Sequence, residues 1–295
     1  MQAVFHLPGL FEFYDFYEKF LPIYRNRREY FYDYTCIGSI YGAPADCLWG
    51  GGRVGFGGDN AEGVLELLAE YGISGRLTFS NLLLRSEHLS DRKCNNLCRM
   101  FEKRENNGVI VSSDILADYL KKNYPGLYLV SSTTKVITFF DEFLNELRRD
   151  EFRYVVPDFR LNKNLERLCL LSDYDKSKVE FLCNECCFIG CNERKACYEN
   201  VSRKALGEEC EDHICHAPFA GEGYSFSRAM ENPTFIGIND IKNVYLPAGF
   251  SNFKIEGRSL GSAILLEFLL YYLVKPEFHL KVREKIYLDS SLDLF

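Results

Sequence analysis

Eight short apolar segments alternate with helix-like segments along the chain, and this alternation limits the fold more than any other feature. Segments of strand length that are separated by amphipathic helical patterns are typical of βαβ units, whose strands lie parallel in one sheet. Eight such units predict a closed (β/α)8 TIM-like barrel, with a doubly wound open sheet as the alternative. The predicted strands cover residues 3–7, 32–41, 76–81, 109–112, 127–132, 153–156, 179–183 and 253–257.

Three of the intervening helices have clear start signals, because a polar residue that can cap the first turn precedes each apolar pattern. The predicted helices, with their caps, are 61–71 (Asp59), 115–123 (Ser113) and 139–149 (Thr138). No Pro/Ser-rich linker, low-complexity stretch or internal repeat divides the chain. We therefore expect a single α/β barrel domain over residues 1–295.

Composition and charge narrow the function classes. The net charge of −7 disfavours a protein that coats nucleic acid nonspecifically, since that binding comes from neutralising phosphates. The most apolar run, residues 264–274, is shorter than the ~20 residues of a membrane span and contains Glu267, so it predicts a buried helix and no membrane partner. No secretion signal is visible at the start, and we expect a cytoplasmic location with reduced cysteines.

A glycine-rich segment follows the second predicted strand. Residues 41–58 contain seven glycines and precede a predicted helix, so their backbone amides could hold an anion, with Arg53 as the charged contact. The spacing matches neither the P-loop nor the G-x-G-x-x-G pattern. A flexible βα loop is the alternative interpretation.

Cysteines are concentrated in one segment late in the chain. Seven of the twelve fall between positions 183 and 215, in a predicted metal-binding loop over residues 183–217. Thiolates are soft ligands that suit zinc and iron–sulfur clusters, and clustered cysteines in a reducing compartment point to metal or catalysis. Cys187-x3-Cys191 is an acceptable ligand pair. The remaining ligands would come from Cys197, Cys210 or Cys215, with Cys183 also available.

The cysteine spacing favours an iron–sulfur cluster over zinc. Zinc sites favour Cys-x2-Cys pairs, and Cys183-x2-Cys186 has no matching second pair. The spacing also differs from Cys-x3-Cys-x2-Cys. The irregular spacing in a loop at a barrel mouth therefore favours a cluster, with structural zinc and free buried cysteines as alternatives.

The last predicted strand carries charges on one face. Because side chains alternate in a strand, Phe253 and Ile255 share one face, and Lys254, Glu256 and Arg258 share the other. In a barrel the apolar face packs on helices, so the charged face points inward. A buried charge loses hydration free energy unless it forms an ion pair or binds a ligand. We therefore expect these three residues to line a site for a polar or anionic substrate. An edge strand with one wet face is the alternative.

The same strand carries a family resemblance. Residues 249–258 read GFSNFKIEGR, which resembles the G-[IF]-x-x-[FL]-K-I-E-G-R element of the peptidase U32 family, and the order of cysteine loop, helix and strand is similar too. The resemblance implies a barrel with a [4Fe-4S] cluster that acts in oxygen-independent hydroxylation or small-group transfer. With this cluster we expect Cys187, Cys191, Cys197 and Cys215 as the main ligands. Its substrates would be RNA bases or small aromatic metabolites, with an electron donor protein as partner. The cysteines here are more closely spaced and more numerous than in the hydroxylation members.

Two other functions remain open. A non-catalytic barrel with structural zinc would use the same cysteines. A cysteine-dependent peptidase would correspond to the activity for which the family was first described, although the sequence contains neither G-x-S-x-G nor H-E-x-x-H. His213 and His216 flank Cys215 and could supply a ligand or a proton. Asp158 and Arg160 follow the sixth predicted strand and could face the barrel mouth.

Overall fold

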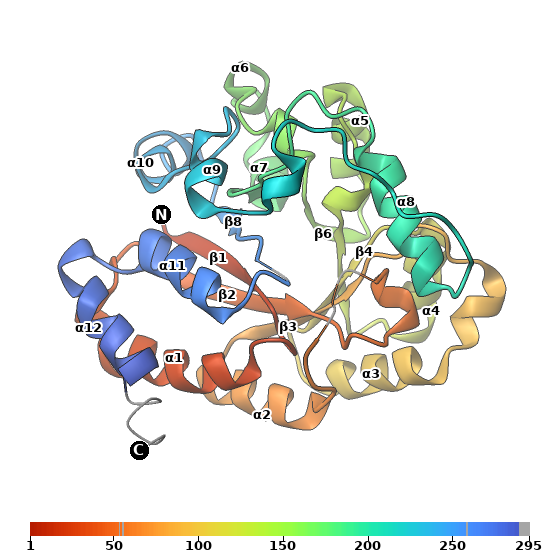
Figure 1. Cartoon of the computed structure of the whole chain (residues 1–295), viewed down its shortest axis with the longest axis horizontal. Coiled ribbons are helices and arrows are strands. Elements are labelled where there is room, and N and C mark those ends of the chain that lie inside the picture. Colours follow the sequence, from red (N-terminus) through yellow and green to blue (C-terminus); the bar gives the residue numbers. More distant parts are fainter. Residues whose placement is uncertain (53, 55, 258, 289–295) are drawn as a thin grey trace.

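Eight parallel strands form one sheet that closes into a barrel (Figure 1). The computed structural model describes residues 1–52, 54, 56–257 and 259–288. The hydrogen-bonded order is β6-β5-β4-β3-β2-β1-β8-β7, and a parallel bridge between Val155 and Val179 brings the two ends together. The predicted (β/α)8 TIM-like barrel is therefore confirmed. The strands are β1 (Ala3–Pro8), β2 (Thr35–Gly42), β3 (Ser74–Phe79), β4 (Gly108–Val111), β5 (Tyr128–Ser131), β6 (Phe152–Val155), β7 (Glu180–Leu182) and β8 (Asn252–Lys254).

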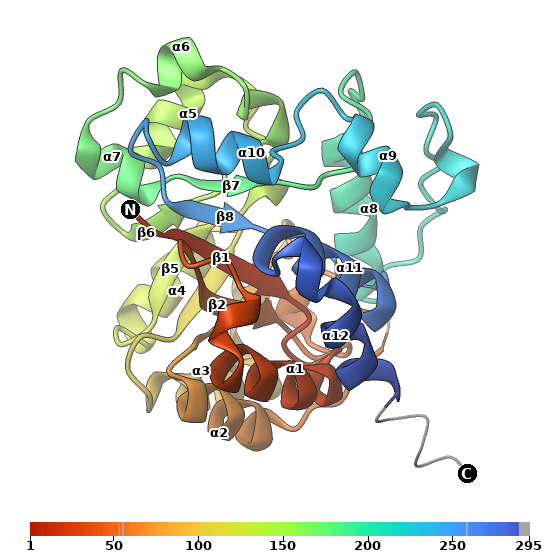
Figure 2. The same ribbon diagram turned by 90° about the vertical axis from the view of Figure 1, so that its left-hand side faces the viewer.

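Helices surround the sheet, and Figures 1 and 2 both place the C-terminal helix α12 beside α1. The α-helices are α1 (Tyr14–Asn26), α2 (Ala61–Tyr71), α3 (Arg92–Glu102), α4 (Asp114–Asn123), α5 (Phe140–Leu147), α6 (Leu165–Leu168), α7 (Asp173–Lys178), α8 (Arg194–Ala205), α9 (Phe226–Glu231), α10 (Ile238–Asp240), α11 (Ser262–Leu273) and α12 (His279–Arg283). Within the described residues, no helix combines the length and apolarity that crossing a membrane requires.

The predicted helices are present, but two of their caps differ from prediction. Helix α2 is capped by Asn60, whose side chain accepts a hydrogen bond from the Gly63 amide, and it ends at Gly72 in the left-handed conformation. Asp59 instead accepts a hydrogen bond from the Lys93 ammonium at 3.3 Å. The residue before α5 is Phe139 rather than Thr138. Ser113 occupies the N-cap position of α4 as predicted, but its side chain makes no capping hydrogen bond.

Side chains along each strand point alternately outward, toward the helices, and inward, into the barrel, so the protein has an outer and an inner core. Outward side chains such as Phe5, Leu77, Val109 and Phe181 are fully buried against the helices and belong to one continuous apolar cluster. Each such side chain contributes roughly 1.5–3 kcal/mol by leaving water. Inward side chains are more polar, because they include charged residues from several strands. The barrel therefore obtains its apolar stabilisation mainly outside the sheet.

The inward core is organised around the carboxylate of Glu180 on β7. It lies 2.5 Å from Nη1 of Arg76, 3.4 Å from Nζ of Lys254 and 3.5 Å from Nε2 of His6. All four residues are buried. Buried charges are tolerated when they are paired, so these contacts make a charged interior possible.

Aromatic rings complete this core. The Arg76 guanidinium lies over the ring of Tyr154 at 4.7 Å, and its Nε donates to the Tyr128 hydroxyl at 2.8 Å. The Lys254 ammonium lies 3.6 Å from the centre of the Tyr41 ring. Cation–π contacts add to the ion pairs when the cation is desolvated. Lys254 is thereby fixed on the inner face of β8, just below the barrel mouth.

The charged core perturbs the titration of its members. Burial, followed by the nearby Arg76, lowers the pKa of His6 from 6.5 to about 3, although Glu180 acts in the opposite direction. Burial alone would raise the pKa of Glu180, but Arg76, His6 and Lys254 outweigh it and hold that pKa well below its usual range. The folded protein thus contains a neutral His6 and an ionised Glu180 near neutral pH.

Replacing the central carboxylate should destabilise the barrel strongly. Glu180→Gln keeps the side-chain shape but leaves Arg76 and Lys254 without their shared counter-charge, and we expect a loss of about 3–5 kcal/mol in the free energy of unfolding. Urea denaturation measures this loss. The matched control is Glu70→Gln, which removes an exposed ion pair with Arg25 and should cost less than about 1 kcal/mol. Equal effects of the two variants would contradict a central role for Glu180.

His6 should make stability depend on pH. Because its pKa is lowered in the folded state, the unfolded chain takes up a proton below pH 6.5 that the folded chain excludes, so stability falls as the pH drops toward 3. Between roughly pH 6.5 and 5 this group should cost about 2 kcal/mol. His6→Gln should flatten the slope in that interval, measured by denaturant titration at several pH values. His279→Gln changes a histidine outside the barrel, and an equally flattened slope in that variant would count against this assignment.

Candidate functional site at the barrel mouth

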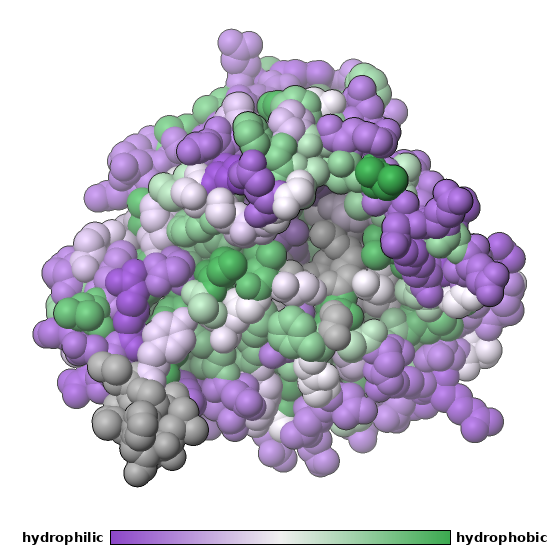
Figure 3. Space-filling view, in the orientation of Figure 1, coloured by the Kyte–Doolittle hydropathy of each residue, from purple (hydrophilic) through white to green (hydrophobic). Residues whose placement is uncertain are grey.

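A cleft opens at the carboxyl ends of the strands. In TIM-like barrels this is the end at which sites for chemistry are built. Figure 3 shows that this face is hollowed near its centre and that hydrophilic residues gather on the side of α8. The polar side chains that line the cleft are those of Tyr41, Thr78, Ser132, Thr133, Thr134, Glu185, Tyr198, Lys254 and Glu256.

Lys254 and Glu256 both line this cleft. The backbone at Glu256 is fixed by Asn184, whose Oδ1 accepts from the Glu256 amide at 2.7 Å and whose Nδ2 donates to the Glu256 carbonyl at 2.9 Å. Asn184 follows β7 and is completely buried. These two hydrogen bonds extend the pairing of β7 with β8 beyond the last residues of both strands. They place Glu256 beside the start of the cysteine segment. Arg258, the third charged residue predicted for this face, lies outside the described residues, and so does Arg53.

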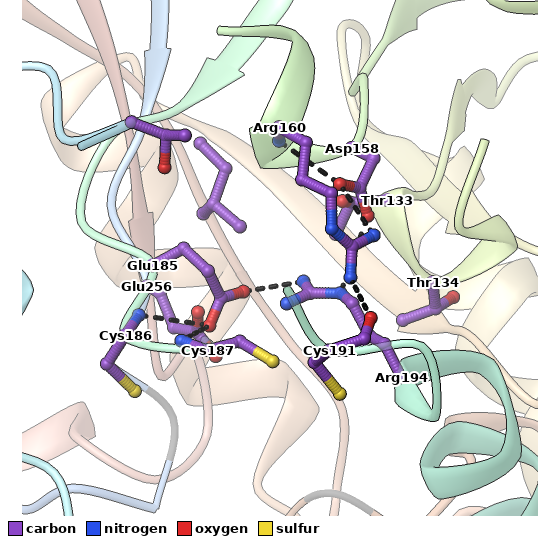
Figure 4. A network of polar contacts seen from close by, with 12 residues as sticks. Thr133, Thr134, Asp158, Arg160, Glu185, Cys186, Cys187, Cys191, Arg194 and Glu256 are labelled. Atoms are coloured by element: carbon purple, nitrogen blue, oxygen red, sulfur yellow. Dashed lines mark hydrogen bonds and ion pairs between the residues drawn. The ribbon is translucent and has the colours of Figure 1, made fainter. Parts of the chain in front are cut away.

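The cysteine segment begins on the rim of the cleft, where Glu185 fixes its first turn. Glu185 Oε1 accepts hydrogen bonds from the amides of Cys186 at 3.1 Å and Cys187 at 2.9 Å. Its Oε2 lies 2.5 Å from Nη2 of Arg194, the first residue of α8 (Figure 4). The same carboxylate thus shapes the cysteine turn and anchors the helix that follows it.

A second arginine holds the far end of the turn. Arg160, in a short 3-10 helix after β6 (Phe159–Leu161), donates from Nε to the Ile189 carbonyl at 3.0 Å and from Nη2 to the Cys191 carbonyl at 2.5 Å. Asp158 lies 3.1 Å from Arg160 and 3.6 Å from Arg194 (Figure 4). Asp158 and Arg160 therefore lie beside the cysteine turn, and their contacts there hold it in place.

The thiols of this turn sit in a charged environment. Burial raises the pKa of Cys187 to about 11, and the adjacent Arg194 guanidinium partly opposes this effect. Burial, together with Glu256 and Glu185, also raises the pKa of Cys186. Cys191 is close enough to Cys187 to influence its charge, and Figure 4 shows the two cysteines next to one another. The turn therefore presents protonated thiols next to a fixed cation.

The other cysteines of the segment lie apart from this turn. Cys197 is half-buried within α8, and Cys215 is exposed in a stretch without helix or strand. Cys183 points outward into the apolar cluster. His213 and His216 approach Glu193 at 3.9 and 3.2 Å. In the part of the chain that the structure describes, no three His, Cys, Asp or Glu side chains are grouped closely enough to hold a metal ion.

Helix α8 closes one side of the mouth. Its Ser202 carbonyl accepts from Asn81 Nδ2 at 3.3 Å, and its Ser202 hydroxyl accepts from the Leu82 amide at 3.2 Å. Asn81 and Leu82 follow β3, on the opposite side of the barrel from β7. The helix that carries Cys197 is therefore tied across the mouth, and Tyr198 from the same helix lines the cleft.

Several buried polar atoms near the mouth have no hydrogen-bond partner among the described residues, including Thr78 Oγ1, Asp158 Oδ2 and Arg194 Nε. The last two face each other as an ion pair at 3.6 Å. Buried polar atoms are nearly always satisfied by protein, water or ligand. Burial raises the pKa of Asp158, with Arg194 and Arg160 opposing it. Thr78, which lines the cleft, is thus suited to a contact with a bound molecule or ordered water.

Several residues of this region were not found from the sequence. Glu180 and Arg76 each interrupt an apolar strand with an isolated charge, which is the same signal that identified Lys254 and Glu256. Glu185 and Arg194 lie within the cysteine segment, but no local pattern pairs them. Their contact depends on how the turn folds.

Comparison with known proteins supports the fold. No protein-family model matches the chain, and a search of curated proteins finds no similar sequence. Among solved structures, the chain is similar to the structure of the U32 peptidase Mk0906, with a TM-score of 0.50 and 14% sequence identity. The match covers 87% of this chain and 94% of that chain. The chain therefore has a distantly U32-like barrel fold.

Proposed function

We propose that this chain is an enzyme that holds a [4Fe-4S] cluster in its cysteine segment, beside a cleft that binds a polar or anionic substrate. The observation that carries the proposal is one juxtaposition: Cys187 and Cys191 lie next to Arg194 on the rim of the cleft that Lys254 and Glu256 line. The U32-like barrel fold agrees with the family resemblance of residues 249–258, and that resemblance is what implies a cluster.

The donor chemistry fits a cluster, although the four predicted ligands are not gathered. Cys187 and Cys191 would provide the first pair, and Arg194 would favour their thiolates electrostatically. Cys215 would complete the set after residues 206–219, which contain neither strand nor α-helix, move toward the turn, and Cys197 would join it from the first turn of α8. Metal binding displaces thiol protons, so the raised pKa of Cys187 should make loading easier at higher pH.

The chain's own residues would bind and orient the substrate. The Lys254 ammonium is held by Glu180 and Tyr41, so it offers a fixed positive charge to a carboxylate, phosphate or carbonyl oxygen. Glu256 and the hydroxyls of Thr133 and Thr134 provide hydrogen-bonding groups around it. A bound cluster would supply electron transfer or an open iron position. Substrates compatible with this cleft are a small aromatic metabolite or an unstacked RNA base, with an electron donor protein as partner.

Metal content tests the proposal directly. Protein purified without oxygen should be brown and contain roughly four iron and four sulfide per chain, as a [4Fe-4S] cluster requires. The double variant Cys187→Ser/Cys191→Ser should lose most of both, because it removes the first ligand pair. Cys169→Ser is the matched control, since that cysteine is exposed outside the segment and its loss should leave iron and sulfide unchanged.

Two further outcomes separate the alternatives. A colourless protein with stoichiometric zinc would overturn the cluster and support the structural zinc barrel. Unchanged iron in the double variant would show that Cys187 and Cys191 are not ligands. Lys254→Met should keep full iron content, because Lys254 is assigned to the substrate and not to the cluster; a loss of iron would contradict that division of roles.

The cysteine peptidase alternative is not supported by the contacts of the turn. The cation beside Cys187 is Arg194, which remains protonated and cannot accept a proton from a nucleophile.

A further inference from the structure

A second group of cysteines lies away from the mouth turn, where the segment after β2 meets helix α3. Cys47 precedes a short 3-10 helix (Leu48–Gly50), and Cys94 lies in the first turn of α3. Their Sγ atoms are 3.1 Å apart, and both side chains are buried. Cys98 is one helical turn further along α3 and is also buried. The candidate metal ligands of the mouth are different residues.

Contacts of the residues before and after Cys47 hold its segment against the segment that carries Cys94. The preceding residues form an ion pair, with Lys93 Nζ 2.6 Å from Asp46 Oδ1. Beyond Cys47, the Trp49 indole donates to the His88 carbonyl at 2.8 Å. The two segments therefore run side by side over several residues, and the two sulfurs are brought together by the fold itself.

We propose that Cys47 and Cys94 form a reversible disulfide, with hydrogen peroxide or a small-molecule disulfide as the oxidant. A disulfide needs its sulfurs about 2.05 Å apart, so closure requires a movement of roughly 1 Å. Side-chain rotation can supply this without a change of fold. In a reducing compartment such a bond is formed transiently and serves as a redox response.

The chemistry balances with peroxide as the two-electron acceptor. The Cys47 thiolate attacks a peroxide oxygen; the O–O bond breaks and Cys47 becomes a sulfenic acid as hydroxide leaves. The Cys94 sulfur then attacks the Cys47 sulfur, the S–O bond breaks, and a second hydroxide leaves. The two thiol protons convert the hydroxides to water, so two thiols and one peroxide give one disulfide and two waters.

The order of the two steps follows from burial. Cys47 is 4% exposed and directly follows the exposed Asp46, whereas Cys94 is completely enclosed and follows the half-buried Lys93. Burial and the contact with Cys47 raise the pKa of Cys94, so Cys94 remains a thiol until its neighbour has been oxidised. Cys47 is therefore the thiol that meets the oxidant, and Cys94 is the resolving thiol.

The bond would act on the glycine-rich segment at the mouth. A side chain at Gly52 would come within 3.0 Å of the Val201 carbonyl, which places Gly52 directly against α8. Cross-linking Cys47 to α3 would fasten the base of this segment, a few residues before it reaches the helix that carries Cys197. This inference does not depend on the proposed cluster.

Differential alkylation and mass spectrometry test the disulfide. The purified chain is treated with hydrogen peroxide, its free thiols are alkylated, and it is digested without reductant. We expect one linked peptide pair containing Cys47 and Cys94, lighter than the two reduced peptides by two hydrogen atoms and separated again by reductant. Cys47→Ser and Cys94→Ser should abolish the pair, whereas the matched variant Cys98→Ser should retain it.

Thermal unfolding provides a second readout. A disulfide that closes a loop of this length should raise the midpoint of unfolding by roughly 5 to 10 °C in the oxidised parent and in Cys98→Ser. Cys47→Ser should show no such rise. Recovery of Cys47 and Cys94 as alkylated free thiols after oxidation, or a link from either of them to Cys98, would overturn the proposal.

Discussion

The carboxylate of Glu180 is the interaction on which the inside of this barrel depends. It provides one negative charge to two buried cations, Arg76 and Lys254, and it also lies 3.5 Å from the neutral imidazole of His6. The arrangement costs desolvation energy, and the outer apolar cluster compensates for that cost. Because the charge is neutralised from below, Lys254 can remain an ammonium at the base of an open cleft. A barrel filled with branched aliphatic side chains would leave no such cation there.

The region between β7 and β8 is stabilised differently from the barrel. Its first turn is fixed by carboxylates and arginines, namely Glu185 with Arg194, and Asp158 with Arg160. Several of its large apolar side chains remain exposed, including Phe188, Ile214 and Phe219. This segment thus has little apolar burial of its own, and its conformation depends on ionic contacts with the mouth. Ion pairs and hydrogen bonds fix the orientation of the groups that they join. Where water reaches them, however, they contribute less to the free energy of folding than the packing of an apolar core does.

The sequence predicted the architecture well because strand and helix patterns are local. All eight strands, and the inward orientation of Lys254 and Glu256, follow from periodicity. What could not be predicted depends on contacts between distant positions: Arg76 and Glu180 are 104 residues apart, and Arg160 reaches a carbonyl 31 residues away. The same limit applies to the cysteines, since spacing indicated a soft metal but not which thiols converge. Cys47 and Cys94 gave no local signal, because 47 residues separate them.

The closure of the barrel between β6 and β7 differs from its other joins. Neighbouring strands elsewhere are linked by ladders of several residue pairs, whereas in the described chain a bridge between Val155 and Val179 joins these two ends. A seam with few hydrogen bonds is where a closed sheet separates at the lowest free energy, in a local opening that leaves the remaining ladders intact. Glu180 adjoins Val179, and the cysteine turn begins five residues further along the same strand and loop. A local opening between β6 and β7 would therefore admit water to the charged interior of the barrel. The same opening would change the conformation of the cysteine turn, so the hydration of the interior and the shape of the mouth would be coupled.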